Sequence, residues 1–422
     1  MSLLLGLLPL TLLLLGFPFF LILLASASVF LLLTGSVPAT ALHQVMFSSI
    51  DKFALLAVPF FIFAGDLMGR GGVSRRLVRW VLSMLGGVRG AMPMTALGTM
   101  VVFSVSGSTA ASVAAVGSLT YDRMRQAGYS PRFASGLLVS SAAIDNLIPP
   151  SIGFILYGIA SETSIVKLFA AGVVPGLILA GFFALAIWWH VRRGVEGRGT
   201  PFSLAEFLAA TRDGIWSIGA PVAVLGGIYA GIFSPTEAAG IACIYAIVVV
   251  SLVYGEMNLM DILESAGRSL VLTAQVFIII AAAGVFSWLL TINGVPQALV
   301  TWVLGLKLDP WMVLLTINVF LLLVGMFLDT ASSILVLTPL MAPVAKAMGI
   351  DPVHFGVIVV MNLSIGTFTP PFGINLFVGQ AVFKLPLSVL YPGVIPFITS
   401  AMCALAVVTF VPSLSLFILK FL

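Results

Sequence analysis

Two short stretches decide how this chain folds: NLIPPS at residues 146–151 and TFTPPFG at residues 367–373. Two consecutive prolines remove two backbone donors and free the carbonyl groups one turn earlier, so a helix breaks at each pair. Both stretches lie in apolar sequence, and non-helical backbone at membrane depth persists only where protein buries it or where it lines a watery cavity. The sequence therefore predicts two broken helices inside a membrane.

The second proline pair repeats the first at a fixed distance, since Pro370 lies 221 positions after Pro149 (370 − 149). The same offset relates Thr109 and Thr330, Ser112 and Ser333, Gly128 and Gly349, Pro131 and Pro352, Gly158 and Gly379, and Pro175 and Pro396. Upstream the match is looser, because Gly72 corresponds to Gly294 at an offset of 222. A register of turn-forming residues over such a length indicates two halves with one architecture.

The composition places these halves in a bilayer. Hydrophobic residues make up 60% of the 422 and charged residues only 8%, against about 25% charged residues in soluble domains. A crossing helix needs about 20 apolar residues, so we expect an all-α polytopic membrane protein with roughly ten crossings plus re-entrant pieces. The expected elements lie near residues 3–16, 18–35, 53–69, 91–120, 133–161 and 168–190, and near residues 214–233, 236–254, 270–291, 311–341, 353–383 and 388–411.

Two further segments need an interpretation. Residues 3–33 stay apolar and have no basic leader, so we expect one or two spanning helices with a break near Gly16, and no cleavable signal. Residues 258–268 carry charges on mixed faces and are expected to form a short interfacial helix.

The basic residues indicate that the halves are inverted. Two connectors of the first half are rich in arginine: Arg70, Arg75, Arg76 and Arg79, then Arg123, Arg125 and Arg132. Of the corresponding connectors in the second half, residues 291–306 carry no basic residue and residues 342–352 carry only Lys346. Because basic loops stay in the cytoplasm, equivalent connectors are expected on opposite faces, cytoplasmic in the first half and periplasmic in the second.

A polar cluster precedes each broken helix and predicts the tip of a re-entrant hairpin. Hydroxyl groups, freed carbonyls and helix N-termini at such a tip can bind a cation or a carboxylate. Carbonyl oxygens of the breaks suit Na+, a hard cation, and an organic anion would fit between the tips. The substrate candidates are Ser106, Gly107, Ser108, Thr109, Thr330 and Ala331. The ion-ligand candidates are Ser104, Ser108, Asp145, Ile148, Pro149, Asp329, Thr330, Ser333, Thr367, Thr369 and Pro370.

Acidic residues inside the apolar sequence sharpen this hypothesis. An ionised carboxylate at membrane depth is costly, so Asp329 and then Asp145 are interpreted as ligands of a coupling ion. Asp66 fits a salt bridge or a helix end, and Glu237 fits the first turn of a helix. The alternative is that the Ser, Thr and Gly residues serve close helix packing and the prolines are simple kinks.

Other classes of function lack their motifs. Cys243 and Cys403 have no CxxC spacing, and the three histidines have no metal-ligand spacing. The sequence has no nucleotide-binding loop and no Ser–His pair, which argues against a self-contained ATP-driven pump and an intramembrane enzyme. A channel is a further alternative, but two closed hairpins favour alternating access. Nucleic acid is not an expected partner.

These motifs together resemble the large membrane subunit of the TRAP (tripartite ATP-independent periplasmic) transporters, the DctM-like family. The resemblance rests on LIPPS at 147–151, FSPTEAA at 233–239, residues 367–375, AG at 171–172 with PG at 175–176, and LGFP at 15–18. It covers essentially the whole chain. One departure is Asp145, where the family usually has a small residue such as glycine.

The resemblance implies a multi-pass protein of the bacterial inner membrane that imports small organic acids, such as C4-dicarboxylates or sugar acids, with two or more Na+ ions. It implies an elevator-type movement of a transport domain (residues 91–190 and 311–422) against a scaffold (residues 1–90 and 191–310, the latter beginning with a cytoplasmic linker). It also implies two partners, a small DctQ-like membrane subunit and a periplasmic DctP-like binding protein. The alternative is a Na+/carboxylate transporter of similar inverted-hairpin design that works without a binding protein.

Overall fold

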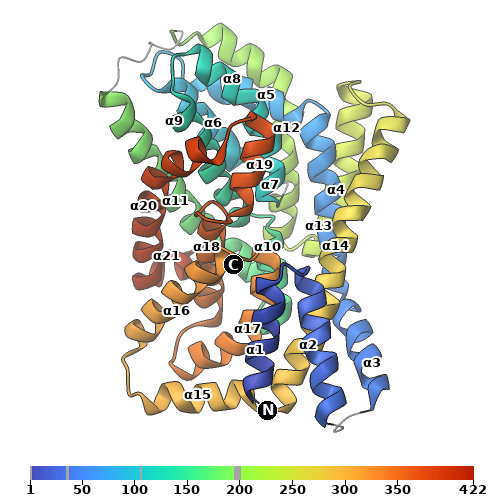
Figure 1. Ribbon diagram of the computed structural model, residues 1–422. Helices are drawn as coiled ribbons and strands as arrows, with labels where there is room; N and C mark the ends of the chain where they lie inside the picture. The colour runs from blue at the N-terminus through green and yellow to red at the C-terminus, as the bar shows by residue number, and fades with distance from the viewer. Residues whose placement is uncertain (1, 35–37, 105–106, 194–200) are drawn as a thin grey trace.

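The computed structural model describes residues 2–34, 38–104, 107–193 and 201–422, and the regular elements in these ranges are helices (Figure 1). Among the described residues, six helices are long and apolar enough to cross a membrane: Phe53–Arg70, Ile165–Arg192, Pro235–Val253, Leu259–Ile292, Thr330–Ala347 and Leu387–Phe410. Shorter apolar helices lie between them. The expected all-α polytopic membrane fold is confirmed.

The first half consists of the helices α1 (Ser2–Leu14), α2 (Phe19–Thr34), α3 (Ala39–Ile50), α4 (Ala57–Arg70), α5 (Val73–Met84), α6 (Ala91–Phe103), α7 (Thr109–Ser112), α8 (Ser118–Gln126), α9 (Pro131–Ser141), α10 (Ile152–Ser161) and α11 (Ile165–Arg193). The chain turns between α1 and α2 at Gly16, whose φ of +78° favours glycine. The expected break at this position is therefore present.

The second half consists of α12 (Leu204–Tyr229), α13 (Pro235–Ile247), α14 (Leu259–Ile292), α15 (Val295–Gly305), α16 (Pro310–Gly325), α17 (Thr330–Ala347), α18 (Pro352–Gly366), α19 (Ile374–Phe383), α20 (Leu387–Phe410) and α21 (Ser413–Leu416). Its helix starts follow the sequence register. Pro131 and Pro352 begin α9 and α18, and Thr109 and Thr330 begin α7 and α17. The starts are specified locally, because proline suits the first helical position and a polar residue precedes each helix.

The expected short interfacial helix at residues 258–268 is wrong. These residues are the first turns of α14, which continues without a break to Ile292. Asn258 and Asp261 form a capping box at its start. Arg268, which looked like an interfacial charge, is partly buried and bonds Asp66 at 3.2 Å and Ser265 at 2.9 Å. Because Asp66 pairs with the charge of Arg268, this residue is accommodated within a continuous helix.

The first half treats the same region differently. The region of the first half that corresponds to α14 contains two helices: α3 ends at Ile50 and α4 begins at Ala57. The chain between them carries Asp51 and Lys52, two charged residues outside the helices, followed by a 3-10 turn. The sequence reading did not predict α3. The connectors after α4 and α14 also proved to be helical, forming α5 and α15.

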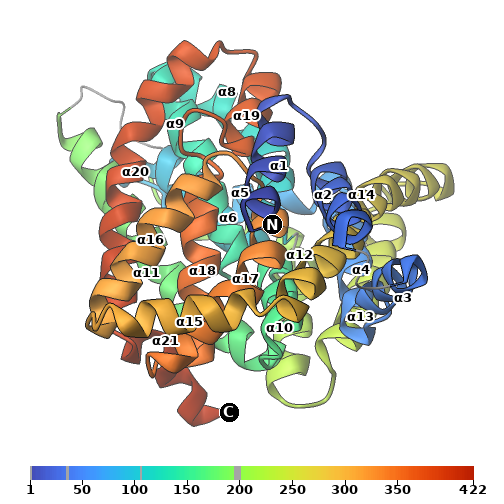
Figure 2. The same cartoon turned by 60° about the horizontal axis from the view of Figure 1, so that its bottom comes forward.

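Equivalent elements lie at opposite ends of the molecule. Figure 1 shows α5 and α8 at one end and α15 at the other, with the broken helices between them. A second division is visible in both views: α3, α4, α13 and α14 lie to one side, and α9, α11 and α20 lie to the other (Figures 1 and 2). The assignment of these ends to opposite membrane faces, which the loop charges predict, stays a prediction.

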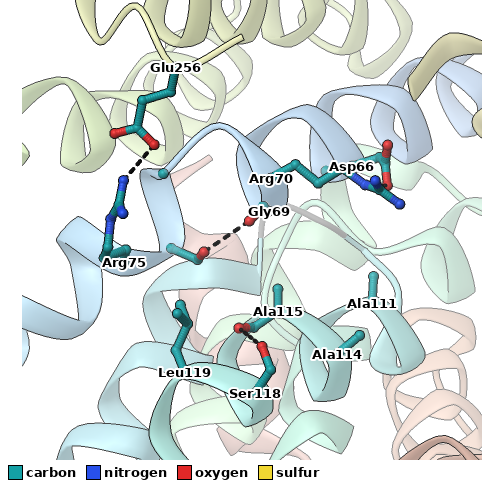
Figure 3. A pocket seen from close by; sticks show the side chains of 13 residues that line it. Asp66, Gly69, Arg70, Arg75, Ala111, Ala114, Ala115, Ser118, Leu119 and Glu256 are labelled. Carbon is teal, nitrogen blue, oxygen red and sulfur yellow. Dashed lines mark hydrogen bonds and ion pairs between the residues drawn. The ribbon is translucent and has the colours of Figure 1, made fainter. Parts of the chain in front are cut away.

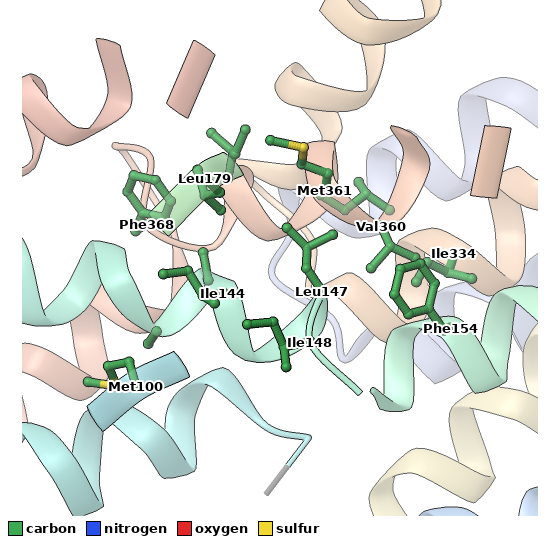
Figure 4. Packing of buried hydrophobic residues seen from close by; sticks show 14 of the residues in the cluster. Met100, Ile144, Leu147, Ile148, Phe154, Leu179, Ile334, Val360, Met361 and Phe368 are labelled. Atoms are coloured by element: carbon green, nitrogen blue, oxygen red, sulfur yellow. The ribbon is translucent and has the colours of Figure 1, made fainter. Parts of the chain in front are cut away.

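The two breaks share the apolar centre of the protein. Leu147 is fully buried and Ile148 nearly so in the first break, and Leu147 lies toward Val360 and Met361 of α18 (Figure 4). Phe368 of the second break belongs to the same cluster. The non-helical backbone of the first break is thus enclosed by protein, whereas the second break is buried at Phe368 and becomes half-buried at Pro370 and Pro371. Non-helical backbone at membrane depth persists where protein buries it or where it lines a watery cavity.

Candidate functional site

The first hairpin tip lies against the break of its own half. Ser108 caps α7 by accepting a hydrogen bond from the Ala111 amide at 3.5 Å. Gly107 adopts a φ of +61°, and a Cβ added there would lie 3.2 Å from the carbonyl oxygen of Pro150. Only glycine permits this approach without displacing the neighbouring backbone. Of the candidate residues at this tip, Ser106 lies outside the described residues.

Asp145 is the central polar group of the first break. It is fully buried in the turn Ala142–Asn146, and Ser112 of α7 donates its hydroxyl to Oδ2 of Asp145 at 2.7 Å. Of the other candidates, Ser104 donates to the carbonyl of Val101, within its own helix. A buried carboxylate with a hydroxyl beside it supplies oxygen ligands of the kind that hard cations prefer. Ser112 was not among the predicted ligands, although its register with Ser333 singled it out.

The second hairpin tip is built around a different carboxylate. Asp329 caps α17: its Oδ2 accepts the Ser332 amide at 3.0 Å and its Oδ1 accepts the Ser332 hydroxyl. In the first turn of this helix, the hydroxyl oxygens of Thr330 and Ser333 are buried and have no hydrogen-bond partner among the described residues. Such groups are rare because an unpaired buried hydroxyl is costly. Their position beside a carboxylate fits a cation site.

The second tip also lies beside the break of its own half. The rings of Phe327 and Phe372 pack with centroids 5.5 Å apart. In the break, Thr367 and Thr369 donate their hydroxyls to the carbonyls of Ser364 and Ile365, both at 2.7 Å. The hydroxyl oxygen of Thr369 can still face an ion, whereas that of Thr367 also accepts a hydrogen bond from Asn375 at 3.1 Å. The Pro149–Pro150 and Pro370–Pro371 bonds, which mark the two breaks, are both cis.

Asn375 joins the two halves. Its Oδ1 accepts the hydroxyl of Thr109 at 2.8 Å, and its Nδ2 donates to the Thr367 hydroxyl oxygen at 3.1 Å. All three residues are buried. The first tip is therefore tied to the second break by one side chain, which the sequence reading included in a motif without giving it a role. Ala331 follows Thr330 in the first turn of α17 and contributes no polar side chain.

The register shows that the acids have exchanged places. Ser108 corresponds to Asp329 at the tips, whereas Asp145 corresponds to Gly366 at the breaks. A Cβ added to Gly366 would lie 2.5 Å from the backbone of Gly325, so the second break has no room for a side chain at this position. Each half thus carries one carboxylate, at the break in the first and at the tip in the second.

Two cavities lie at corresponding places in the two halves. The first, of about 400 Å³, separates α4 and α5 from the first hairpin (Figure 3), and the second, of about 700 Å³, lies beside α15 and α17. The register maps lining residues of one onto lining residues of the other: Gly65, Gly69, Ser74, Arg75 and Ser118 correspond to Ser287, Thr291, Pro296, Gln297 and Pro339. Because α5 and α15 lie at opposite ends, the cavities belong to opposite ends as well.

The first cavity is bordered by ion pairs. Asp66 bonds Arg70 at 3.3 Å and Arg268 at 3.2 Å, which confirms the salt-bridge interpretation of Asp66. Across the cavity, Glu256 bonds Arg75 at 2.6 Å (Figure 3). The side chains of Arg70 and Arg75 are 51% and 58% exposed, so each can also meet a solute. Glu237 lies elsewhere and forms the predicted helix start, a capping box with Ser234.

An all-α, multi-pass fold with two tip-and-break pairs is typical of ion-coupled membrane transporters. A family model described as "Tripartite ATP-independent periplasmic transporter, DctM component" matches residues 7–414, and the chain belongs to this family.

The chain resembles several characterised permease proteins. It is 41% identical to the ectoine/5-hydroxyectoine TRAP transporter large permease protein UehC of Ruegeria pomeroyi, with 96% of each chain covered. It is 40% identical to the C4-dicarboxylate large permease protein DctM of Pseudomonas aeruginosa, over 88% of this chain and 87% of that one. The isethionate permease protein DctMQ of Oleidesulfovibrio alaskensis is also 40% identical over 91% of this chain, which spans 61% of that longer protein.

A solved structure shows the same fold. The YdaH transporter of Alcanivorax borkumensis superposes with a TM-score of 0.66 over 88% of this chain and 89% of its own, at 15% identity.

Proposed function

We propose that this chain is the permease of a transporter that imports a small organic acid together with Na+. This proposal rests on the duplicated site. In each half a hairpin tip lies against a double-proline break, and a carboxylate lies at the break in the first half and at the tip in the second. Ion-coupled transporters use such discontinuous helices because helix ends and freed carbonyls bind ions without a fully charged cage.

The first Na+ site is proposed at the first tip and break. Its ligands are the Asp145 carboxylate, the Ser112 and Ser108 hydroxyls, and the carbonyls of Ile148 and Pro149. The fully buried carboxylate and its 2.7 Å bond to Ser112 support this assignment. A positive ion here offsets a charge that is costly in a membrane interior.

The second Na+ site is proposed at the second tip and break. Its ligands are Asp329, Thr330 and Ser333 with Thr367, Thr369 and the carbonyl of Pro370. Support comes from the two buried hydroxyls of Thr330 and Ser333 that lack a partner among the described residues. The organic acid is proposed to bind between the tips, near Ser108, Thr109 and Thr330.

The cavities suggest how the site reaches both faces. In this proposal residues 91–190 and 311–422 form a transport domain that moves as an elevator against residues 1–90 and 191–310. Support comes from the two cavities, which occupy register-equivalent places at opposite ends of the molecule. Arg70 and Arg75 would attract an anion to the first cavity, whereas the second has Gln297 at the position of Arg75.

The relatives support a proposal for the substrate and the partners. Relatives are named for C4-dicarboxylates, 2,3-diketo-L-gulonate and sialic acid, and we propose a small organic acid for this chain. The family description is tripartite and periplasmic, so we propose a small membrane subunit and a periplasmic binding protein as partners.

The test is uptake of labelled organic acids into proteoliposomes that contain the chain and its small subunit, with the binding protein outside. Uptake that requires both an inward Na+ gradient and the binding protein supports the proposal. Uptake that needs Na+ but not the binding protein would instead support the alternative transporter design. Uptake that ignores Na+ would overturn the ion coupling.

A further inference from the structure

Asn375 is a polar side chain that lies between the two candidate ion sites. It follows the second break, at the start of α19, and it is fully buried. Its Nδ2 faces the carbonyl oxygen of Val139 in α9 at 3.4 Å. A carbonyl oxygen can only accept a hydrogen bond, so this contact fixes the orientation of the amide. Oδ1 of Asn375 therefore faces Thr109, and the Thr109 hydroxyl donates to it at 2.8 Å.

The hydrogen bonds on the other side of Asn375 also have a fixed direction. Thr367 donates its hydroxyl hydrogen to the Ser364 carbonyl at 2.7 Å. Its hydroxyl oxygen therefore accepts from Nδ2 of Asn375, and its carbonyl accepts the backbone amide of Asn375 at 2.9 Å. A buried amide whose donors and acceptor are all bonded holds its neighbours in one geometry. Asn375 thus fixes the tip of the first half relative to the break of the second.

This link reaches a proposed ligand of each Na+ site. Thr109 begins α7, the single helical turn that ends at Ser112, and Ser112 donates to Asp145 in the first site. Thr367 is itself a proposed ligand of the second site. An ion that fixes the turn of α7 therefore also favours the bound geometry of Thr367, because Asn375 bonds both.

The opposite pair, the second tip and the first break, differs at the equivalent position. The register places Phe154 at the position of Asn375 (375 − 221) and Thr330 at the position of Thr109. Phe154 is fully buried in the apolar cluster, and the Thr330 hydroxyl has no hydrogen-bond partner among the described residues. At this position of the register, the hydrogen-bonded link is present in one tip-and-break pair and is replaced by an apolar ring in the other.

We infer that Asn375 is a positioning residue that couples the two Na+ sites, so that an ion bound at one site raises the affinity of the other. This coupling rests on the proposed function, which supplies the two ion sites. Coupling between sites is reciprocal and typically changes an affinity by about 5- to 150-fold. Two coupled sites give sigmoidal Na+ binding, with a Hill coefficient that approaches the number of sites, about 2.

The test measures the binding of radioactive Na+ to the purified full chain, with choline chloride keeping the ionic strength constant. We expect two ions per chain and a Hill coefficient of about 2 for the wild type and for Thr109→Ser, which keeps the hydroxyl. Thr109→Val removes the bond to Asn375 but leaves every proposed Na+ ligand in place. It should still bind two ions, with a Hill coefficient of about 1. Asn375→Leu, which breaks the link from the other side, should give the same result.

A second measurement isolates one site. Asp145→Asn removes the charge of the first site, and Na+ should then bind the second site roughly tenfold more weakly than in the wild type. In the Thr109→Val background the same substitution should not weaken the second site, because the link is already broken. A purely structural role of Asn375 would lower stability or affinity but would leave the Hill coefficient at its wild-type value.

The outcomes separate the coupling from the proposed function. A wild-type protein that binds two ions with a Hill coefficient of about 1 would overturn the coupling and leave the proposed function standing. A Thr109→Val variant that keeps the wild-type coefficient would do the same. A wild-type protein without Na+-specific binding would instead overturn the proposed ion sites, and the coupling with them.

Discussion

The two halves of this protein share one backbone arrangement but place their carboxylates at different positions. Each has a capped hairpin tip against a double-proline break, at equivalent positions in the register. In the first half the acid is Asp145, fully buried at the break and bonded to Ser112. In the second it is Asp329, at the tip and engaged in capping α17. The comparison shows that two repeats can keep the same hairpin tips and double-proline breaks while the carboxylate lies at the break in one repeat and at the tip in the other.

The largest effect is expected when the acid of the first half is copied into the second. Gly366→Asp would force a side chain into the backbone of Gly325, 2.5 Å from an added Cβ. We expect a loss of stability of several kcal/mol, on the order of 3 or more, from overpacking and a buried charge. Thermal unfolding and the yield of monodisperse protein measure it. Gly226→Ala, which meets nothing within 4 Å, is the control and should behave as wild type.

Removing the charge at the first break should affect transport more than stability. Asp145→Asn keeps the shape of the side chain and its contact with Ser112, but it lacks the negative charge. Because the carboxylate is fully buried, we expect Na+-driven uptake to fall by roughly 100-fold. The melting temperature should stay the same or rise, since a buried charge is costly. Unchanged uptake would show that this carboxylate has no part in ion coupling.

The second acid can be tested by giving it the residue of the first half. Asp329→Ser places at this tip the residue found at Ser108, which also caps its helix. The cap should survive, whereas Asp329→Ala should lose about 1 kcal/mol of stability. Because Asp329 is partly exposed, we expect a smaller effect on uptake than at Asp145, roughly tenfold. If Asp329→Ser transported as well as wild type, the residue would be a cap and nothing more.

The smallest effect concerns the helices α5 and α15, which occupy equivalent places but differ in charge. Arg79 of α5 pairs with Glu206 at 2.9 Å and Asp213 at 3.3 Å, whereas α15 has no charged residue. Since these side chains are about half exposed, Arg79→Gln should cost no more than about 1 kcal/mol. Thermal unfolding at low and high salt checks this, and a loss that persists in high salt would contradict it.

The sequence was informative where a local signal exists. The double prolines, the tips before them, the capping box at Glu237 and the helix starts at Pro131 and Pro352 all follow from residues close together in the chain. The continuous α14 could not be recognised, because the charge of Arg268 is satisfied by Asp66, 202 residues away. The bond from Thr109 to Asn375 joins residues 266 apart, and no local pattern signals it.

The most direct test of the central claim is the stabilisation of the purified protein by Na+. A ligand that binds only the folded state raises the melting temperature as its concentration increases. We expect NaCl to raise the melting temperature above that in choline chloride of equal ionic strength. Asp145→Asn and Asp329→Ser should each lose part of this difference, and the double variant should lose all of it. A double variant that keeps the full Na+-specific shift would contradict the proposal of two ion sites with exchanged carboxylates.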